Sequence, residues 1–169
     1  MKVLIVSDNH GDADILKVIH ERHEEEVDAF IHCGDSELAQ DCAEMAPFTG
    51  VRGNCDYDDS YPNDVTVPIA DVNCYVTHGH LYNVKMSLMN LQYRAEEVGA
   101  KIVCYGHSHI AGAEYTNGVL FINPGSIRLP RLRREKTYAI LDVKHNEAVV
   151  SFYTDAGEEV KELSVTTTL

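Results

Sequence analysis

The apolar positions in the first part of the chain alternate between two periodicities. Residues 3–6 form a β-branched apolar run that stops at the polar stretch 7–11, which predicts a buried strand followed by a loop. Apolar residues then recur at helical spacing, so we expect a helix over 12–24 with Asp12 as its N-cap.

The same alternation follows directly afterwards. A short strand over 29–31, a helix over 37–46 and a strand over 49–52 are expected from the apolar spacing. Strands and helices in this order predict a parallel β-α-β core.

The remainder of the chain is mostly of β type. Asn117-Gly118 is a strong hairpin signal, and Gly99 is a suitable end for a helix. The expected elements are a hairpin over 65–77, a helix over 85–99, a strand over 102–105, hairpins over 113–122 and 138–153, and an edge strand from Val160. We therefore predict a single α/β domain over 1–169, in which two sheets pack together with helices outside.

Charge and cysteine content narrow the class of protein. The formal net charge of −13 disfavours stable binding to nucleic acid or to an anionic membrane, although bound divalent cations would still admit a phosphate-bearing substrate. The five cysteines are odd in number and lack CxxC spacing, so we expect a reducing, cytoplasmic location rather than a disulfide framework. We also expect no signal peptide and no membrane span, because no apolar run is long enough.

Candidate metal ligands follow the expected strands. Ligands of open α/β sheets bind at the carboxyl ends of the strands, where side chains from distant segments converge. Seven residues occupy such positions: Asp8, His10, Asp35, Asn54, His78, His107 and His109. Any one of them alone could be an ordinary loop residue, but the whole set indicates a metal centre.

The residue types suit two borderline cations. Carboxylates, imidazoles and an amide favour Mn²⁺ first, with Ni²⁺, Fe, Zn²⁺, Co²⁺ or Mg²⁺ as alternatives. A shared carboxylate can hold two cations about 3.5–4 Å apart, which activates a bridging water as hydroxide and polarises phosphoryl oxygens.

Several short blocks resemble those of the calcineurin-like metallophosphoesterases. The closer resemblance is to the small single-domain phosphodiesterases of bacteria and archaea, a branch that includes the retromer scaffold subunit. It extends from Met1 through Asn123-Pro124-Gly125-Ser126 into the last hairpin. The blocks are Asp8-Asn9-His10, Gly34-Asp35, Gly53-Asn54-Cys55-Asp56, His78-Gly79-His80 and Gly106-His107-Ser108-His109.

This resemblance implies a fold and a division of roles. The fold would be a β-sandwich flanked by helices. Asp8, His10 and His109 would hold the first metal, Asn54, His78 and His107 the second, and Asp35 would bridge them. We take Asp35, Asn54, Cys55 and His80 as candidate catalytic residues.

Cys55 departs from the wider family, in which many members carry a histidine after the asparagine. A thiol cannot act on the leaving group as an imidazolium would, so the resemblance favours diesters over monoesters; the alternative is a small buried thiol. His80 could contact substrate or a supporting carboxylate, or be structural. The histidines at 20, 23, 32 and 145 are expected to be ordinary surface or packed residues.

A basic stretch over 128–136 holds five of the 14 Lys and Arg residues. It could attract a phosphate-bearing substrate, with Arg128 as the best single candidate, or be a solvated loop or an oligomer contact. Three functions stay open: a phosphodiesterase acting on a small diester, a non-catalytic protein-binding scaffold, and a phosphomonoesterase or protein phosphatase. The intact ligand set favours the first, and a homo-oligomer stays open.

Overall fold

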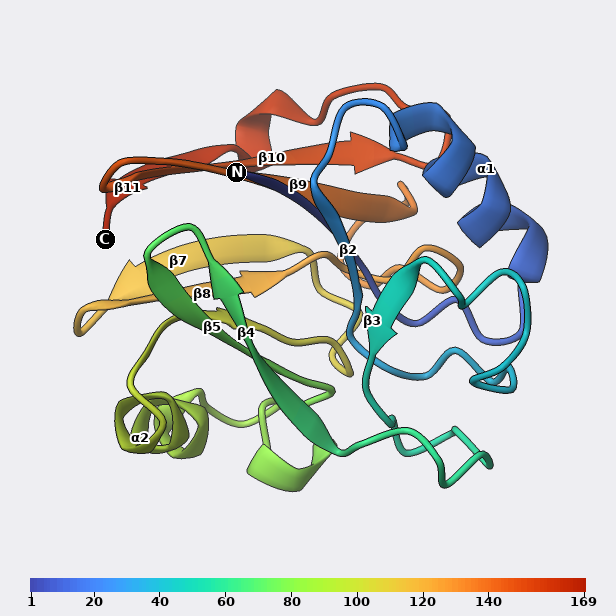
Figure 1. Cartoon of the computed structure of the whole chain (residues 1–169), viewed down its shortest axis with the longest axis horizontal. Helices are drawn as coiled ribbons and strands as arrows, with labels where there is room; N and C mark the ends of the chain where they lie inside the picture. Colours follow the sequence, from blue (N-terminus) through green and yellow to red (C-terminus); the bar gives the residue numbers. More distant parts are fainter.

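Two mixed β-sheets pack face to face in the computed structural model, which describes residues 1–169 (Figure 1). The first sheet has the strand order β11-β10-β9-β1-β2-β3, and the second has the order β4-β5-β6-β8-β7. The strands of the first sheet are β1 (Lys2–Val6), β2 (Ala29–His32), β3 (Phe48–Gly50), β9 (Thr137–Lys144), β10 (Glu147–Thr154) and β11 (Val165–Thr168). Those of the second are β4 (Asp64–Ile69), β5 (Val72–Thr77), β6 (Ala100–Cys104), β7 (Gly112–Thr116) and β8 (Val119–Asn123).

Each sheet has a parallel centre and antiparallel flanks. Strands β1, β2 and β3 run parallel, while β9 pairs with β1 in the antiparallel sense. Strands β5, β6 and β8 are also parallel, with β4 and β7 added as antiparallel edges. The parallel strands of each sheet therefore end at a common edge, where their loops can meet.

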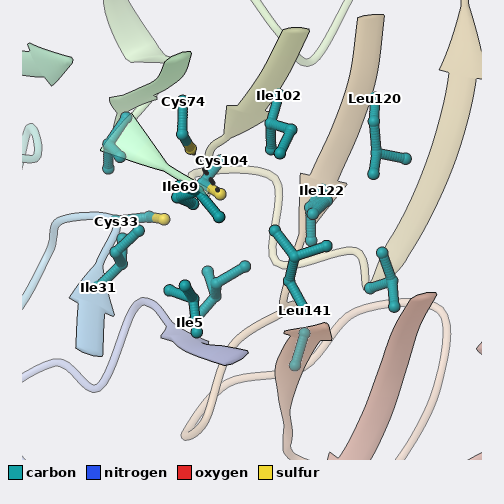
Figure 2. Packing of buried hydrophobic residues seen from close by; sticks show 14 of the residues in the cluster. Ile5, Ile31, Cys33, Ile69, Cys74, Ile102, Cys104, Leu120, Ile122 and Leu141 are labelled. Carbon is teal, nitrogen blue, oxygen red and sulfur yellow. Dashed lines mark hydrogen bonds between the residues drawn. The ribbon is translucent and has the colours of Figure 1, made fainter. Parts of the chain in front are cut away.

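The main core lies between the sheets. Val3 and Ile5 of β1 point into it, whereas Leu4 and Val6 point to the outer face of the same sheet. All four are buried because both faces of β1 are covered, which explains the continuous apolar run in the sequence. Figure 2 shows the inner layer, in which Ile5, Ile31 and Leu141 of the first sheet face Ile69, Ile102, Leu120 and Ile122 of the second.

The two α-helices cover opposite outer faces of the sandwich (Figure 1). Helix α1 (Ala13–His23) begins at Asp12, whose side chain accepts a hydrogen bond from the N–H of Ile15. It buries Leu16 and Ile19 against the outer face of the first sheet. Helix α2 (Met89–Glu97) packs on the second sheet, and short 3₁₀ turns occur at His80–Tyr82 and Lys161–Leu163. Neither helix has the length and apolar character needed to cross a membrane.

The sandwich flanked by helices, the three hairpins and the C-terminal edge strand are confirmed. The helix expected over 37–46 is wrong, because this segment forms isolated turns. Its backbone N–H groups bond to side chains from a later loop: Asp56 accepts from the N–H of Glu37, and Asp58 accepts from the N–H of Gln40. Glu37 also has a φ of 54°, which a right-handed helix does not allow.

Other boundaries differ by a few residues. Helix α2 begins at Met89 rather than at 85, because Asn83 adopts a φ of 55° and residues 83–86 form turns. The strand expected over 49–52 is β3, which ends at Gly50.

Candidate metal centre

The seven candidate ligands gather where the loops of both sheets meet. The first sheet supplies Asp8 and His10 after β1, Asp35 after β2 and Asn54 after β3. The second supplies His78 after β5, and His107 and His109 after β6. Residues almost a hundred positions apart thus share one site, as expected from the positions of the strand ends.

One group of ligand atoms surrounds Asp8. Its Oδ1 lies 3.1 Å from His109 Nε2 and 3.7 Å from His10 Nε2. The two ring nitrogens are 3.2 Å from one another. All three side chains offer a ligand atom within 4.8 Å of the others, so one cation can contact all of them.

A second group surrounds His78. Its Nε2 lies 3.2 Å from Asp35 Oδ2 and 3.2 Å from Asn54 Oδ1. The same nitrogen is 3.9 Å from Asp8 Oδ1, which joins the second group to the first. The His107 ring lies beside that of His78, with centroids 5.1 Å apart.

The ring orientations leave the Nε2 atoms directed at the site. Nδ1 of His78 donates to the carbonyl of Cys33 at 2.7 Å, and Nδ1 of His109 donates to the carbonyl of Leu129 at 2.8 Å. A backbone carbonyl can only accept, so Nδ1 carries a proton and Nε2 is the ring nitrogen left to face a metal.

Five of the seven candidate ligands adopt left-handed backbone conformations. The φ angles are 57° for Asp8, 44° for His10, 54° for Asp35, 67° for His107 and 59° for His109. Such angles are uncommon outside glycine, and they gather at functional sites, where the surrounding structure holds them.

Two glycines allow the close approach of the loops. A Cβ at Gly53 would overlap Oδ1 of Asp35, and a Cβ at Gly106 would overlap Ser7 Oγ and lie 2.6 Å from Asp8 Oδ2. Any side chain at either position would displace a candidate ligand.

Asp56 supports the loops behind the site, a role that the sequence patterns did not reveal. Its buried carboxylate accepts from the N–H groups of Asp35 at 2.9 Å, Gly53 at 2.7 Å and Glu37 at 2.7 Å. It thereby ties the loop of Asp35 to the loop of Asn54. The only signal in the sequence was its place within the Gly53–Asp56 block.

His32 and Ser126 also support the site. His32 is buried: it accepts from the N–H of Gly34 at Nδ1, and Nε2 donates to Asn9 Oδ1 at 2.8 Å. Ser126 Oγ donates to the carbonyl of Asp8 at 2.8 Å. Both contacts fix the loop that carries Asp8.

The electrostatics of the site favour a cation. Burial would raise the pKa of Asp35, but the hydrogen bond and charge of His78 outweigh it and hold the pKa well below the usual range. Asp8 Oδ1 is buried and has no hydrogen-bond partner. A buried, unsatisfied carboxylate oxygen among imidazole nitrogens matches the donor set of a divalent transition metal, so the residues fit the metals that the sequence implies.

Cys55 lies at the edge of the same centre. Its thiol is within 4.8 Å of ligand atoms of His10 and Asp35, and its N–H donates to Asp35 Oδ1 at 2.8 Å. The side chain is exposed, so the alternative of a small buried thiol is wrong. Partial burial and the Asp35 carboxylate raise the pKa of the thiol to about 11, which keeps it neutral at pH 7.

His80 and Arg128 lie on either side of the cluster. The His80 ring is 5.3 Å from that of His78 and 6.1 Å from that of His107, between centroids. Burial and the charge of His78 lower its pKa. Arg128 is exposed, and its guanidinium donates to the carbonyl of His10, so it lies beside the first group of ligand atoms.

The fold and this centre together define a two-sheet sandwich with a carboxylate and imidazole site at one edge. Comparison with protein families matches residues 1–146 to the calcineurin-like phosphoesterase superfamily domain. The chain belongs to this family, and the resemblance inferred from the sequence is confirmed.

Individual relatives agree with this assignment. The chain is 49% identical to the probable metallophosphoesterase YsnB of Bacillus subtilis, over the full length of both. It is 30% identical to the phosphodiesterase MJ0936 of Methanocaldococcus jannaschii, covering 87% of this chain and 96% of that one.

Solved structures share the fold. A predicted phosphoesterase from Streptococcus pneumoniae superimposes with a TM-score of 0.95 at 34% identity, covering 99% of this chain and 97% of that one. The vacuolar protein sorting 29 protein of Cryptosporidium parvum superimposes with a TM-score of 0.77 over 99% and 98% of the two chains, and at 16% identity this likeness concerns the fold alone.

Proposed function

We propose that this phosphoesterase is a phosphodiesterase that uses two divalent cations, with Mn²⁺ the preferred metal, to hydrolyse a small phosphodiester. The observation that carries the proposal is the pair of ligand groups joined through Asp8 and His78, with the buried Asp8 Oδ1 left without a partner.

The two groups divide the ligands as the family resemblance implies. Asp8, His10 and His109 would hold one cation, and Asn54, His78 and His107 the other, with Asp35 shared between them. Two cations there would lower the pKa of a bound water and neutralise the phosphoryl oxygens.

The protein's own residues orient the substrate and set its class. Arg128 places a guanidinium beside His10, where it can bind a non-bridging phosphoryl oxygen. Cys55 presents a neutral thiol to the centre, so it offers the leaving group neither a charge nor an acidic proton. Diesters with good leaving groups need that help least, which supports diester preference.

Two other functions fit the site less well. A protein-binding scaffold does not need the ligands, yet all seven candidate positions are present and directed together. A phosphomonoesterase would benefit from an imidazole where Cys55 stands. The name of MJ0936 as a phosphodiesterase supports the same preference. We further propose that residues 1–169 act as one domain in the cytoplasm, with a small-molecule substrate rather than a membrane or stably bound nucleic acid.

Metal stoichiometry tests the centre. Protein reconstituted separately with Mn²⁺, Ni²⁺, Mg²⁺ and Zn²⁺ should bind two equivalents per chain by elemental analysis. Asp35→Asn should weaken both sites and abolish turnover, because it removes the shared carboxylate. Asp58→Asn is the matched control, since the Asp58 carboxylate accepts from the N–H groups of Gln40 and Ser60 and bonds no candidate ligand. Retention of no more than one cation after reconstitution would contradict a dinuclear site.

Substitution of Cys55 tests the substrate class. The wild type should hydrolyse bis-nitrophenyl phosphate well and nitrophenyl phosphate weakly. Cys55→His should raise the monoester rate relative to the diester rate by up to about 10²-fold, the lower end of general acid catalysis. Cys55→Ala should keep diester turnover, because the neutral thiol takes no part in bond breaking. An inactive alanine variant that still holds two cations would make Cys55 catalytic and refute this account.

A further inference from the structure

A cavity of about 460 Å³ opens beside the metal centre, on the outer face of the second sheet. Its walls come from residues 84–88 before α2, from the loop after β6 and from β7 and β8. The larger apolar side chains lining it are Val84, Leu88, Tyr105, Ile110 and Phe121. This volume lies within the range of about 300–1,000 Å³ that small-molecule sites occupy.

Part of the cavity wall belongs to the segment that carries two of the candidate metal ligands. Ser108, which forms part of its wall, stands between His107 and His109. Arg131, also in the wall, donates its backbone N–H to the carbonyl of His109 at 3.0 Å. Lys85 lines the cavity too and lies near enough to His107 for its charge to act on that ring.

The charged and the apolar residues of the cavity wall suit different parts of a substrate. The charged residues of the wall are Lys85, Arg131 and Glu114. The two cations lie next to candidate metal ligands, which suits the anionic phosphoryl group. The apolar and aromatic walls, in contrast, suit an uncharged group that is large and flat. We propose, on the basis of the phosphodiesterase function above, that this cavity binds one ester arm of the diester and that this arm is an aromatic ring, of the aryl or nucleobase kind.

Gly112 provides a position from which to fill the cavity. Glu114 pairs with Phe121, whose side chain packs on the outer face of the second sheet, so Gly112, two residues earlier, shares that face. A Cβ built on Gly112 meets no atom within 4 Å, and its φ is not in the left-handed region. A larger side chain can therefore enter the cavity without displacing the strand.

The experiment compares two diesters with the same leaving group. Phenyl 4-nitrophenyl phosphate has an aromatic arm, and methyl 4-nitrophenyl phosphate has a small one. Gly112→Leu should lower kcat/KM for the phenyl diester by about 10-fold or more relative to the methyl diester, as expected when a pocket rejects a ring. Gly112→Ala should have a smaller effect. Thr116→Leu, which places the same leucine side chain on the same face of β7 at a position that does not line the cavity, should have none. Thymidine 5′-(4-nitrophenyl phosphate) distinguishes a nucleobase from a simple aryl arm. A larger loss with this substrate than with the phenyl diester in Gly112→Leu indicates a nucleobase, and a smaller loss indicates an aryl arm.

A binding measurement separates this proposal from the proposed function. Methylphenylphosphinate and dimethylphosphinate are monoanions without an ester bond, so their affinities for the Mn²⁺-treated protein do not depend on turnover. Calorimetry should show tighter binding of the phenyl compound, lost in Gly112→Leu. Equal affinities, or equal loss for both compounds, would overturn the cavity proposal even if methyl 4-nitrophenyl phosphate is hydrolysed. Failure to hydrolyse that diester, with phenyl-selective binding retained, would refute the function and leave the cavity assignment standing.

Discussion

Asp56 offers a sharp test of how the site is built, because it supports the ligand loops without being a ligand candidate. One oxygen, Oδ2, accepts from the N–H groups of Asp35 and Gly53, while Oδ1 accepts from the N–H of Glu37 and from Ser36 Oγ. Asp56→Asn preserves the shape and keeps one acceptor oxygen. Its amide group, however, must face two of these donors.

The expected loss in the free energy of unfolding follows from the hydrogen bonds that Asp56 makes. Hydrogen bonds to an ionised group contribute about 1.5–3 kcal/mol each. The asparagine loses two of them and leaves the donors facing an NH₂ group in a buried position, so we expect a loss of about 3–6 kcal/mol in the free energy of unfolding. Domains are stable by about 5–15 kcal/mol, so the variant should fold at 25 °C with a reduced urea midpoint.

Urea unfolding monitored by circular dichroism, followed by titration with Mn²⁺, provides the assay. Metal affinity should fall together with stability, because the loops of Asp35 and Asn54 lose their shared anchor. Asp58→Asn is the matched control: Asp58 accepts from Gln40 N–H at 2.7 Å and Ser60 N–H at 3.0 Å, farther along the same two loops, and it bonds no candidate ligand. It should leave the metal affinity unchanged. A loss of less than about 1 kcal/mol in Asp56→Asn, the range of an ordinary surface change, would refute the reasoning.

Two further predictions concern Arg128 and His32. Arg128→Ala should raise KM for a charged diester more than it lowers kcat, because the guanidinium beside His10 binds ground and transition states alike. If steady-state kinetics show both constants unchanged, Arg128 does not bind substrate and belongs to a solvated loop. Burial lowers the pKa of His32 to about 4, below the unfolded value of about 6.5, so the unfolded state binds the proton first and stability is lost as the pH falls from 6.5 to 4. The loss in the free energy of unfolding is about 3 kcal/mol. His32→Gln should therefore flatten the pH dependence of urea unfolding measured in EDTA. An equally steep pH profile in the variant would contradict this assignment to His32.

The sequence predicted where the candidate ligands lie better than it predicted the residues that support them. Asp8 and His78 are recognisable because each follows an apolar run, and parallel strands bring their ends to one edge whatever the loops do. Asp56 is different, since its role depends on the path of the loop from Gly53 and on which N–H groups point at it. No periodicity encodes such a path.

The error at 37–46 has the same origin. Leu38, Cys42 and Met45 are spaced as on a helix and do pack together against the outer face of the first sheet. The backbone of the segment is nevertheless held by hydrogen bonds to the carboxylates of Asp56 and Asp58, which lie later in the chain. Local apolar spacing therefore identified what is buried and missed the conformation that buries it. The cavity beside β7 was beyond the sequence for a similar reason, because it is formed by four separate segments.

The candidate ligands that adopt left-handed backbone conformations lower the stability of the fold. A non-glycine residue in this conformation costs about 1–3 kcal/mol, and Asp8, His10, Asp35, His107 and His109 all adopt it. Glycine would relieve the strain at each position, so mutational drift without a need for the metals would move these loops toward glycine and toward greater stability. These loops are therefore less stable than glycine would make them, and the cost falls on the residues that present carboxylate and imidazole groups to one site.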